Sequence, residues 1–290
     1  MMKKNKQRGN RLGFLIFELY LALGVKHAYA LLYFVCLHYL LFDFRLKKAS
    51  LKYILLRFSG TGFFKRYFHL YRLYINTGKN LIDLRQLQLR PEKVLFKCDD
   101  DYIIKVLDEG RGLLMLSSHT GNWQVMMKKL PDFKVRKNVV MQLQGFDELN
   151  KFLAIENGDK EGINIIDSEK GMETSLEILS ELKNGNLVSI MADRTITSAK
   201  NISVKFFNNT VSLPLGPFLI AASAGAPIVQ LIPYRNDTCS YKLEIYRISI
   251  PDSGKKKDKI QMIAEEYIHN IETFLTRHPY EWNATSLNAT

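Results

Sequence analysis

LLMLSSHTGNWQ, residues 113–124, places an apolar run directly before a polar turn that contains a histidine, a glycine and a tryptophan. The unbroken apolar residues of Gly112–Ser117 are typical of a buried strand, and Asn122–Leu130 has the pattern of a helix. His119 therefore stands in the turn between them. The helix residues that we expect to face inward are Trp123, Met126, Met127 and Leu130.

From about Pro91 onward the chain repeats this alternation of strands and helices. We predict strands over Lys137–Leu143, Gly162–Asp167, Leu187–Ala192, Ile202–Phe207, Pro227–Tyr234 and Tyr241–Ile250, and helices over Asp147–Glu156, Met172–Lys183, the end of Pro214–Ala224 and Lys257–Arg277. Repeated strand–helix units predict an α/β fold with a mixed, largely parallel central sheet flanked by helices. Ligand sites in such sheets lie at the carboxyl ends of strands, where both His119 and Asp193 fall.

The positive charge of the chain is concentrated at its start. The formal net charge is +12, and residues 1–72 hold 14 lysines and arginines but only two acidic residues, Glu18 and Asp43. The remainder is balanced in charge. This asymmetry favours an attachment segment over a uniformly basic protein. We predict a basic, membrane-associated helical region over residues 1–90 and an α/β domain over residues 91–290.

Two apolar runs, residues 12–24 and Ala28–Phe42, leave three interpretations of that first region. A secretory signal would explain the basic start, but Glu18 and Lys26 interrupt it. A transmembrane helix is the second, although Ala28–Phe42 would extend only about 22 Å against a hydrocarbon core of about 30 Å. The third, which we favour, is a pair of helices lying in one face of a membrane, followed by basic residues that meet anionic lipid. A buried helical hairpin under a basic surface is the alternative without a membrane.

Composition and spacing exclude several other classes of protein. With 47% apolar and 24% charged residues the chain is globular rather than disordered. The basic residues alternate with leucines and aromatics, and no nucleic-acid-binding motif accompanies them, so we expect no nucleic acid partner. Neither the cysteines nor the other histidines have metal-ligand spacing, so we expect no metal and interpret the cysteines as packing residues: Cys36, Cys98, Cys239, His27, His38, His69, His269 and His278.

Four stretches in order resemble a known family across nearly the whole chain. They are HTGNWQ at 119–124, MADR at 191–194, FFNNTVSLPLGPFLIAASAGAPIVQLIPYR at 206–235 and RHPYEWNA at 277–284. The first is similar to the H-x-G-N-W-E block of the bacterial lipid A biosynthesis (lauroyl/myristoyl-type) acyltransferases. These are relatives of the glycerolipid acyltransferases, with which they share an H-x4-D/E motif. The others resemble that family's Pro-x-Gly-Pro, Gly-Ala-Pro and terminal Pro-x-x-Trp regions.

This resemblance implies transfer of a fatty acyl chain from a thioester, acyl carrier protein or CoA, to a hydroxyl or amine of a membrane lipid. No other cofactor and no covalent acyl-enzyme are implied. His119 is suited to serve as general base, and backbone N–H groups of Thr120–Trp123 are candidates to bind the oxyanion. Arg194 suits a phosphate. Further candidate substrate-binding residues are Gly121, Asn122 and Ser118.

The resemblance leaves several lipid acceptors open. A lipid A precursor is the family's usual acceptor, but similar sequences serve aminolipids, glycolipids and aryl-polyene-type pigments. Because basic residues near a membrane segment favour the cytoplasmic side, we expect the protein at the cytoplasmic face of a bacterial inner membrane.

Gln124 differs from the family pattern. The family has at this position an acidic residue that orients the histidine. An amide oxygen can accept the Nδ1–H of His119 but supplies no charge to stabilise an imidazolium. Two alternatives follow. Asp193 supplies the missing carboxylate as a third catalytic residue beside His119 and Gln124, or the protein is a weak or inactive relative that binds lipid or acyl carrier.

Overall fold

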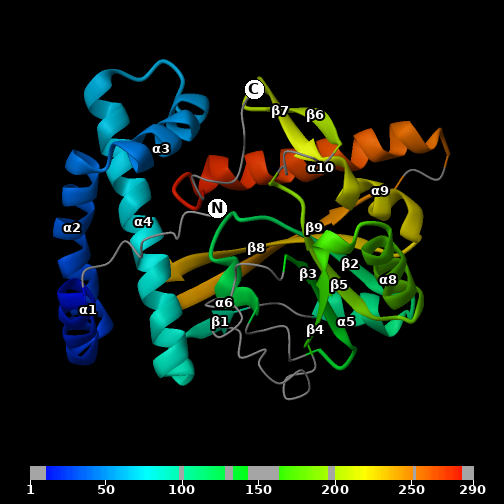
Figure 1. Cartoon of the computed structure of the whole chain (residues 1–290), viewed down its shortest axis with the longest axis horizontal. Helices are drawn as coiled ribbons and strands as arrows, with labels where there is room; N and C mark the ends of the chain where they lie inside the picture. The colour runs from blue at the N-terminus through cyan, green and yellow to red at the C-terminus, as the bar shows by residue number, and fades with distance from the viewer. Residues whose placement is uncertain are drawn as a thin grey trace, which may run out of the picture.

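The computed structural model describes residues 11–97, 101–127, 133–142, 163–194, 200–250 and 253–282. A seven-stranded sheet occupies its centre (Figure 1), in the order β1-β9-β8-β2-β5-β3-β4. Its strands are β1 (Leu95–Lys97), β2 (Leu113–Ser117), β3 (Lys137–Met141), β4 (Ile163–Asp167), β5 (Leu187–Met191), β8 (Ile228–Asp237) and β9 (Ser240–Ile248).

Every pairing in this sheet is parallel except that of β8 with β9, which is antiparallel. The predicted α/β fold with a mixed, largely parallel sheet is therefore confirmed. The antiparallel pairing arises because only Thr238 and Cys239 separate the two strands, and so short a connection forces a hairpin.

Successive residues of the central strand β2 face opposite layers of core. Leu114 and Leu116 pack with the helices on one face, whereas Leu113 and Met115 pack with those on the other. This alternation explains why the strand is apolar throughout, since both of its faces are covered. The first layer holds α8 (Met172–Lys183), α9 (Leu215–Ala224) and α10 (Lys256–Arg277), and the second holds α5 (Asp101–Asp108) and α6 (Trp123–Met127).

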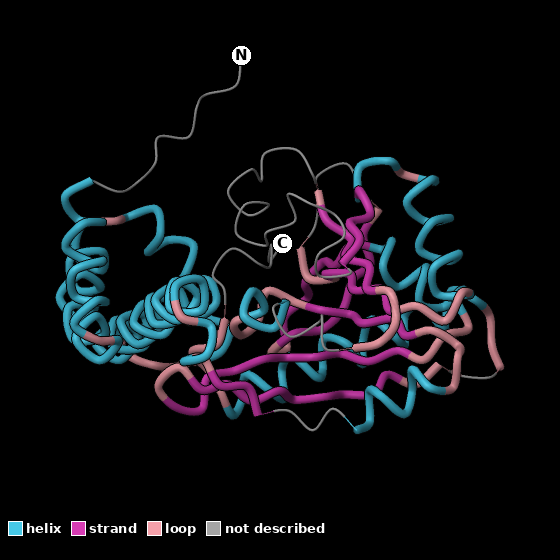
Figure 2. The backbone as a smooth tube through the Cα atoms, turned by 90° about the horizontal axis from the view of Figure 1, so that it is seen from below, coloured by secondary structure: helices cyan, strands magenta, loops and turns pink. Residues whose placement is uncertain are grey.

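The described helices before the sheet are α1 (Arg11–Leu23), α2 (Val25–Phe42), α3 (Phe44–Arg57) and α4 (Phe63–Leu89). Gly24, whose φ of 131° suits glycine, separates α1 from α2, and the Asp43 carboxylate caps α3 by accepting the N–H groups of Arg45 and Leu46. Figures 1 and 2 show α4 beside the sheet, with α1 and α2 on its far side.

The helical region is joined to the α/β part through the end of the chain. The Tyr53 ring stacks on Trp282 at 5.0 Å, and its hydroxyl donates to the Pro279 carbonyl at 2.6 Å. Trp282 also stacks on Phe206 of the hairpin formed by β6 (Asn201–Phe206) and β7 (Asn209–Pro214). Trp282 thus packs between the two parts.

Most of the predicted elements agree with the structure, and a few differ. The helix predicted over Met172–Lys183 has those bounds, whereas β7, which pairs with β6, is absent from the predicted strands. The predicted helix over Asp147–Glu156 and Cys98 lie outside the described residues. The described residues also form two short 3-10 helices, η1 (Pro91–Lys93) and η3 (Ser168–Lys170).

Candidate active site

His119 and Asp193 meet at the carboxyl edge of the central sheet. The parallel pairing of β2 with β5 places Ser117 beside Met191, and His119 and Asp193 each follow two residues later. The sequence predicted that both residues lie at the carboxyl edge of the sheet, and the structure shows that they are in contact there. No side chain has to cross the sheet to make the contact.

Asp193 accepts two hydrogen bonds from His119, one from the ring Nδ1 at 2.8 Å and one from the backbone N–H at 2.9 Å. The carboxylate has no exposed surface, while 12% of the imidazole side chain is exposed. Because Asp193 is placed to accept the Nδ1–H, the ring nitrogen Nε2 carries the lone pair in the neutral tautomer. The geometry therefore leaves Nε2 able to accept a proton and keeps the Asp193 carboxylate away from water.

Ser117, the last residue of β2, is held by three contacts. The Ser117 carbonyl accepts the Ala192 N–H at 3.0 Å and the Tyr267 hydroxyl at 2.8 Å, and its Oγ lies 3.1 Å from Oγ of Ser189. Burial, and then the nearby Asp193 charge, hold the pKa of Tyr267 well above its ordinary value, so it remains a neutral donor. These contacts hold the end of β2 against β5 and against Tyr267 of α10.

Gly121 allows the turn after His119 to approach the sheet. Its φ is +72°, and a Cβ there would lie 1.8 Å from the Pro233 carbonyl oxygen. Any other residue would collide with that oxygen and would also carry backbone strain. Glycine at this position is therefore required by packing.

Most of the backbone donors proposed for the oxyanion are already used within the protein. The N–H of Thr120 donates to Ser118 Oγ at 3.2 Å, that of Gly121 to the Glu281 carbonyl at 2.7 Å and that of Asn122 to the Pro233 carbonyl at 3.1 Å. This corrects the expectation for these three groups. Within the described ranges, the Trp123 N–H is the member of the set without an acceptor.

The side chains predicted to contact substrate differ in their accessibility. Ser118 and Asn122 are 2% and 4% exposed, and Asn122 Nδ2 donates to the Asn80 carbonyl at 3.1 Å and to Tyr241 Oη at 2.9 Å. Asn122 thus ties the turn to α4 and β9. The Trp123 ring lies edge-on to that of His119, with centroids 5.8 Å apart.

Gln124 and Arg194 flank the pair. Gln124 is half-buried in the first turn of α6, and in the part of the chain that the structure describes it makes no hydrogen bond to His119. Arg194 is exposed directly after Asp193. The described carboxylate that contacts the His119 ring is that of Asp193.

A set of buried polar residues, which the sequence patterns did not predict, lies next to the turn that follows His119. Asp83, Arg235 and Tyr241 are joined by hydrogen bonds, with Asp83 fully buried on α4. A signal was present, because Asn76, Asn80 and Asp83 recur at helical spacing and so share one face of α4.

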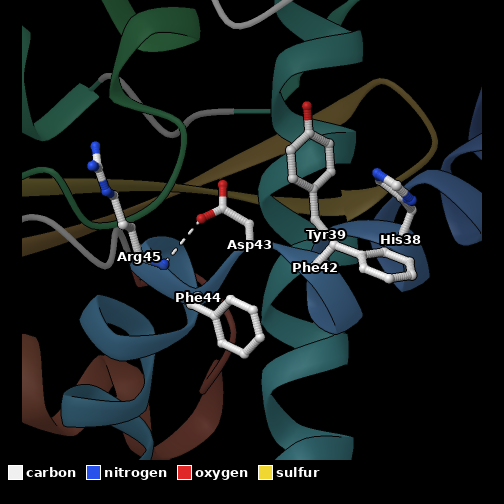
Figure 3. Close-up of a pocket in the computed structure, with 6 residues that line it drawn as sticks. All are labelled: His38, Tyr39, Phe42, Asp43, Phe44 and Arg45. Atoms are coloured by element: carbon white, nitrogen blue, oxygen red, sulfur yellow. Dashed lines mark hydrogen bonds between the residues drawn. The ribbon is translucent and has the colours of Figure 1, made fainter.

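A hollow of about 440 Å³ lies away from this pair, at the corner between α2 and α3 (Figure 3). None of the predicted site residues lines it. The imidazole on a buried carboxylate lies at the sheet edge instead, and we therefore take that edge as the candidate active site. The lining residues are His38, Tyr39, Phe42, Asp43, Phe44 and Arg45.

The site is thus an α/β sheet that carries, at neighbouring strand ends, a histidine hydrogen-bonded to a buried carboxylate. Residues 81–284 match the family described as bacterial lipid A biosynthesis acyltransferase. This match covers most of the chain, and the protein belongs to that family.

Curated relatives include phosphatidylinositol mannoside acyltransferases of mycobacteria. The chain is 24% identical to that of Mycolicibacterium smegmatis over 187 residues, 64% of this chain and 59% of the relative. It is also 24% identical to that of Mycobacterium tuberculosis over 185 residues, 63% of this chain and 56% of the relative. The matched region thus spans less than two thirds of these relatives.

Proposed function

We propose that the protein transfers a fatty acyl chain from a thioester to a hydroxyl of a glycolipid at a membrane surface. The observation that carries the proposal is the His119–Asp193 pair, with its Nδ1–Oδ1 distance of 2.8 Å. Membership of the lipid A acyltransferase family supports the reaction class. A family named for lipid A and relatives named for a phosphatidylinositol mannoside both favour a sugar-bearing lipid acceptor.

In the proposed reaction His119 Nε2 takes the proton of the acceptor hydroxyl as the oxygen attacks the thioester carbonyl carbon. Asp193 stabilises the resulting imidazolium through Nδ1. The carbon–sulfur bond then breaks, and the leaving thiolate recovers the proton from His119. An ester and a free thiol are the products. The Trp123 N–H remains as a backbone donor for the oxyanion, and exposed Arg194 is placed to meet a phosphate of the carrier or acceptor.

The donor is an acyl thioester of either acyl carrier protein or CoA. In both donors the acyl group is attached to an arm that carries a phosphate. The guanidinium of Arg194 is suited to bind that phosphate in either donor. Side-by-side assays with the two donors distinguish them.

We assign the membrane contact to the outer face of α1 and α2. In α1 the exposed Leu15, Leu19 and Leu23 follow one another at four-residue spacing, and in α2 Phe34, Leu37 and Leu41 share one face. Among the described helices, Val25–Phe42 alone has the length and apolar composition to cross a membrane, and 22% of it is buried in the protein. Because its Tyr29 hydroxyl donates to Asp83 inside the protein, an in-plane position is favoured over spanning.

The corner between α2 and α3 adds aromatic and basic side chains to that contact. Phe42 and Phe44 are 65% and 74% exposed beside the hollow of Figure 3, and Phe64 at the start of α4 is 86% exposed. Exposed Arg45 and Lys48 lie in the same segment. Such a mixture suits the headgroup region of an anionic membrane, and we place it at the cytoplasmic face.

The test is an acyl-transfer assay with purified protein, bacterial membranes and labelled acyl-carrier or CoA thioester. His119→Ala should lower the rate by about 10²- to 10⁴-fold, while vesicle binding is retained. The control is His269→Ala, which changes an exposed histidine of α10. Equal transfer by wild type and His119→Ala would contradict the proposal and favour a lipid- or carrier-binding role.

Membrane docking is tested by sedimentation with anionic vesicles. A Phe34→Ser, Phe44→Ser, Phe64→Ser variant should lose most binding. The control, Met172→Ser with Leu176→Ser, removes two side chains of α8 that are 78% and 62% exposed. Equal loss in both variants would show that general surface hydrophobicity is responsible and would reject the assigned face.

A further inference from the structure

Asp83 of α4 is the centre of a buried polar network that the proposed reaction does not itself use. It has no exposed surface and accepts hydrogen bonds from Arg235 Nε at 2.9 Å, from the Tyr241 hydroxyl at 2.5 Å and from the Tyr29 hydroxyl. Cys239 Sγ lies 3.5 Å from the same carboxylate. A buried carboxylate with this many donors is costly to remove and rigid in position.

One branch of the network reaches the active-site turn through Tyr241. The Tyr241 hydroxyl donates its proton to Asp83 and accepts from Asn122 Nδ2 at 2.9 Å through one of its lone pairs. Asn122 lies three residues after His119 and directly before α6. The side chain that holds the turn therefore rests on Asp83 through one intermediary.

A second branch reaches the same turn through Asn80. Arg235, which is paired with Asp83, also donates to Asn80 Oδ1, and the Asn80 carbonyl accepts from Asn122 Nδ2 at 3.1 Å. Asn80 Nδ2 contacts Glu281 Oε2 at 3.3 Å, and the Glu281 carbonyl accepts the Gly121 N–H at 2.7 Å. Both residues that follow Thr120 are thus held by groups ordered around the Asp83–Arg235 pair.

The third branch leads outward to α2, the helix with the exposed apolar face. Tyr29 is 8% exposed and contributes its hydroxyl to Asp83. A separate hydrogen bond between the same two helices, from the Tyr71 hydroxyl to the Tyr33 carbonyl at 2.9 Å, is exposed and does not include Asp83. Of these two described hydrogen bonds of α2, the one from Tyr29 is continuous with the active-site turn and the one from Tyr71 is not.

We infer that Asp83 is a positioning residue that couples α2 to the His119 turn through Tyr241 and Asn122. The inference rests on the proposed acyl transfer for its kinetic consequence. Docking of α2 on the membrane keeps Tyr29 on Asp83, and Asp83 keeps Asn122, and with it the turn, in the geometry that His119 requires.

The kinetic test compares conservative tyrosine variants. Tyr241→Phe should lower kcat about tenfold with KM changed less than about twofold, since misplacement by about 1 Å at a catalytic centre can cost up to 10²-fold. Tyr29→Phe should lower kcat about threefold or more. Tyr71→Phe, the matched control, should leave kcat within a factor of about 1.5. All three should bind anionic vesicles like wild type.

A spectroscopic test needs no activity. The chain has two tryptophans, Trp123 beside His119 and Trp282 in the core. With fluorotryptophan incorporated, the ¹⁹F resonance of Trp123, assigned with Trp282→Phe, should shift or broaden in Tyr29→Phe and Tyr241→Phe but not in Tyr71→Phe.

The outcomes separate the inference from the proposed function. A loss confined to KM or to vesicle binding, an equal effect of Tyr29→Phe and Tyr71→Phe, or an unchanged Trp123 resonance in Tyr241→Phe each overturns the coupling. If wild type transfers no acyl group, the proposed function fails, and the ¹⁹F comparison alone still decides whether α2 and the turn are coupled.

Discussion

The carboxylate of Asp193 receives both the ring Nδ1 and the backbone N–H of His119, at 2.8 and 2.9 Å. These two contacts fix the imidazole and the start of its turn at once. His119 therefore has a buried carboxylate as its partner although position 124 is a glutamine. A neutral residue at 124 avoids a second negative charge beside the first.

Gln124→Glu should therefore give no gain in activity. Asp193 already occupies the Nδ1 side of His119, so an added carboxylate has no vacant position on that nitrogen. We expect kcat within about threefold of wild type, consistent with a weakly coupled neighbouring charge. Steady-state kinetics of the two proteins check this, with Gln124→Ala as the neutral control. A large gain confined to Gln124→Glu would mean that Asp193 does not support the histidine.

Gly121→Ala should destabilise the fold by roughly 4 kcal/mol or more, in the range of the most disruptive single substitutions. The new Cβ would lie 1.8 Å from the Pro233 carbonyl oxygen, at a φ of +72°. Gly216→Ala is the matched control, since a Cβ there meets nothing within 4 Å and the residue lies in α9. That change should be neutral or stabilising by up to about 1 kcal/mol. Denaturant unfolding measures both, and similar losses would refute the close approach.

Glu281→Gln should alter how stability depends on pH. Burial raises the pKa of the Glu281 carboxyl above its ordinary 4.5, although Arg235 and Asn80 act in the opposite direction. As pH rises from 4.5 through the higher folded-state pKa, the unfolded chain holds fewer protons than the folded one, and wild type loses stability. The glutamine variant lacks this loss, so the difference in unfolding free energy should move in its favour as pH rises. A difference that stays constant, or moves the other way, contradicts the assignment.

The fold, and the position of His119 and Asp193 at one edge of the sheet, could be predicted because both depend on local patterns. Unbroken apolar runs before His119 and Asp193 identify buried strands, and the topology of α/β sheets brings their carboxyl ends to one edge. The structure then shows that β2 pairs with β5, although β3 and β4 lie between them along the chain. The sequence also showed which motif position had lost its carboxylate.

The network behind the turn could not be predicted in the same way. Asp83 and Arg235 are separated by 152 positions, and Asp83 lies in a helix whose other charged residues suggest solvent. Periodicity shows that Asn76, Asn80 and Asp83 share a face but not what that face meets. The partners depend on how α4 docks against the β8–β9 hairpin, a long-range contact that local spacing does not specify.

The most direct test of the account is the rate of acyl transfer by Asp193→Asn, measured beside wild type and Asp167→Asn. Asp167 also ends a strand of the sheet, β4, but caps the following turn through the Glu169 N–H at 3.0 Å and does not contact His119. An amide at 193 can still bond to Nδ1 but cannot stabilise the imidazolium, so transfer should fall by about 10²- to 10⁴-fold while Asp167→Asn stays near wild type. Transfer that is unchanged in Asp193→Asn would contradict the claim that this carboxylate replaces the one missing at Gln124.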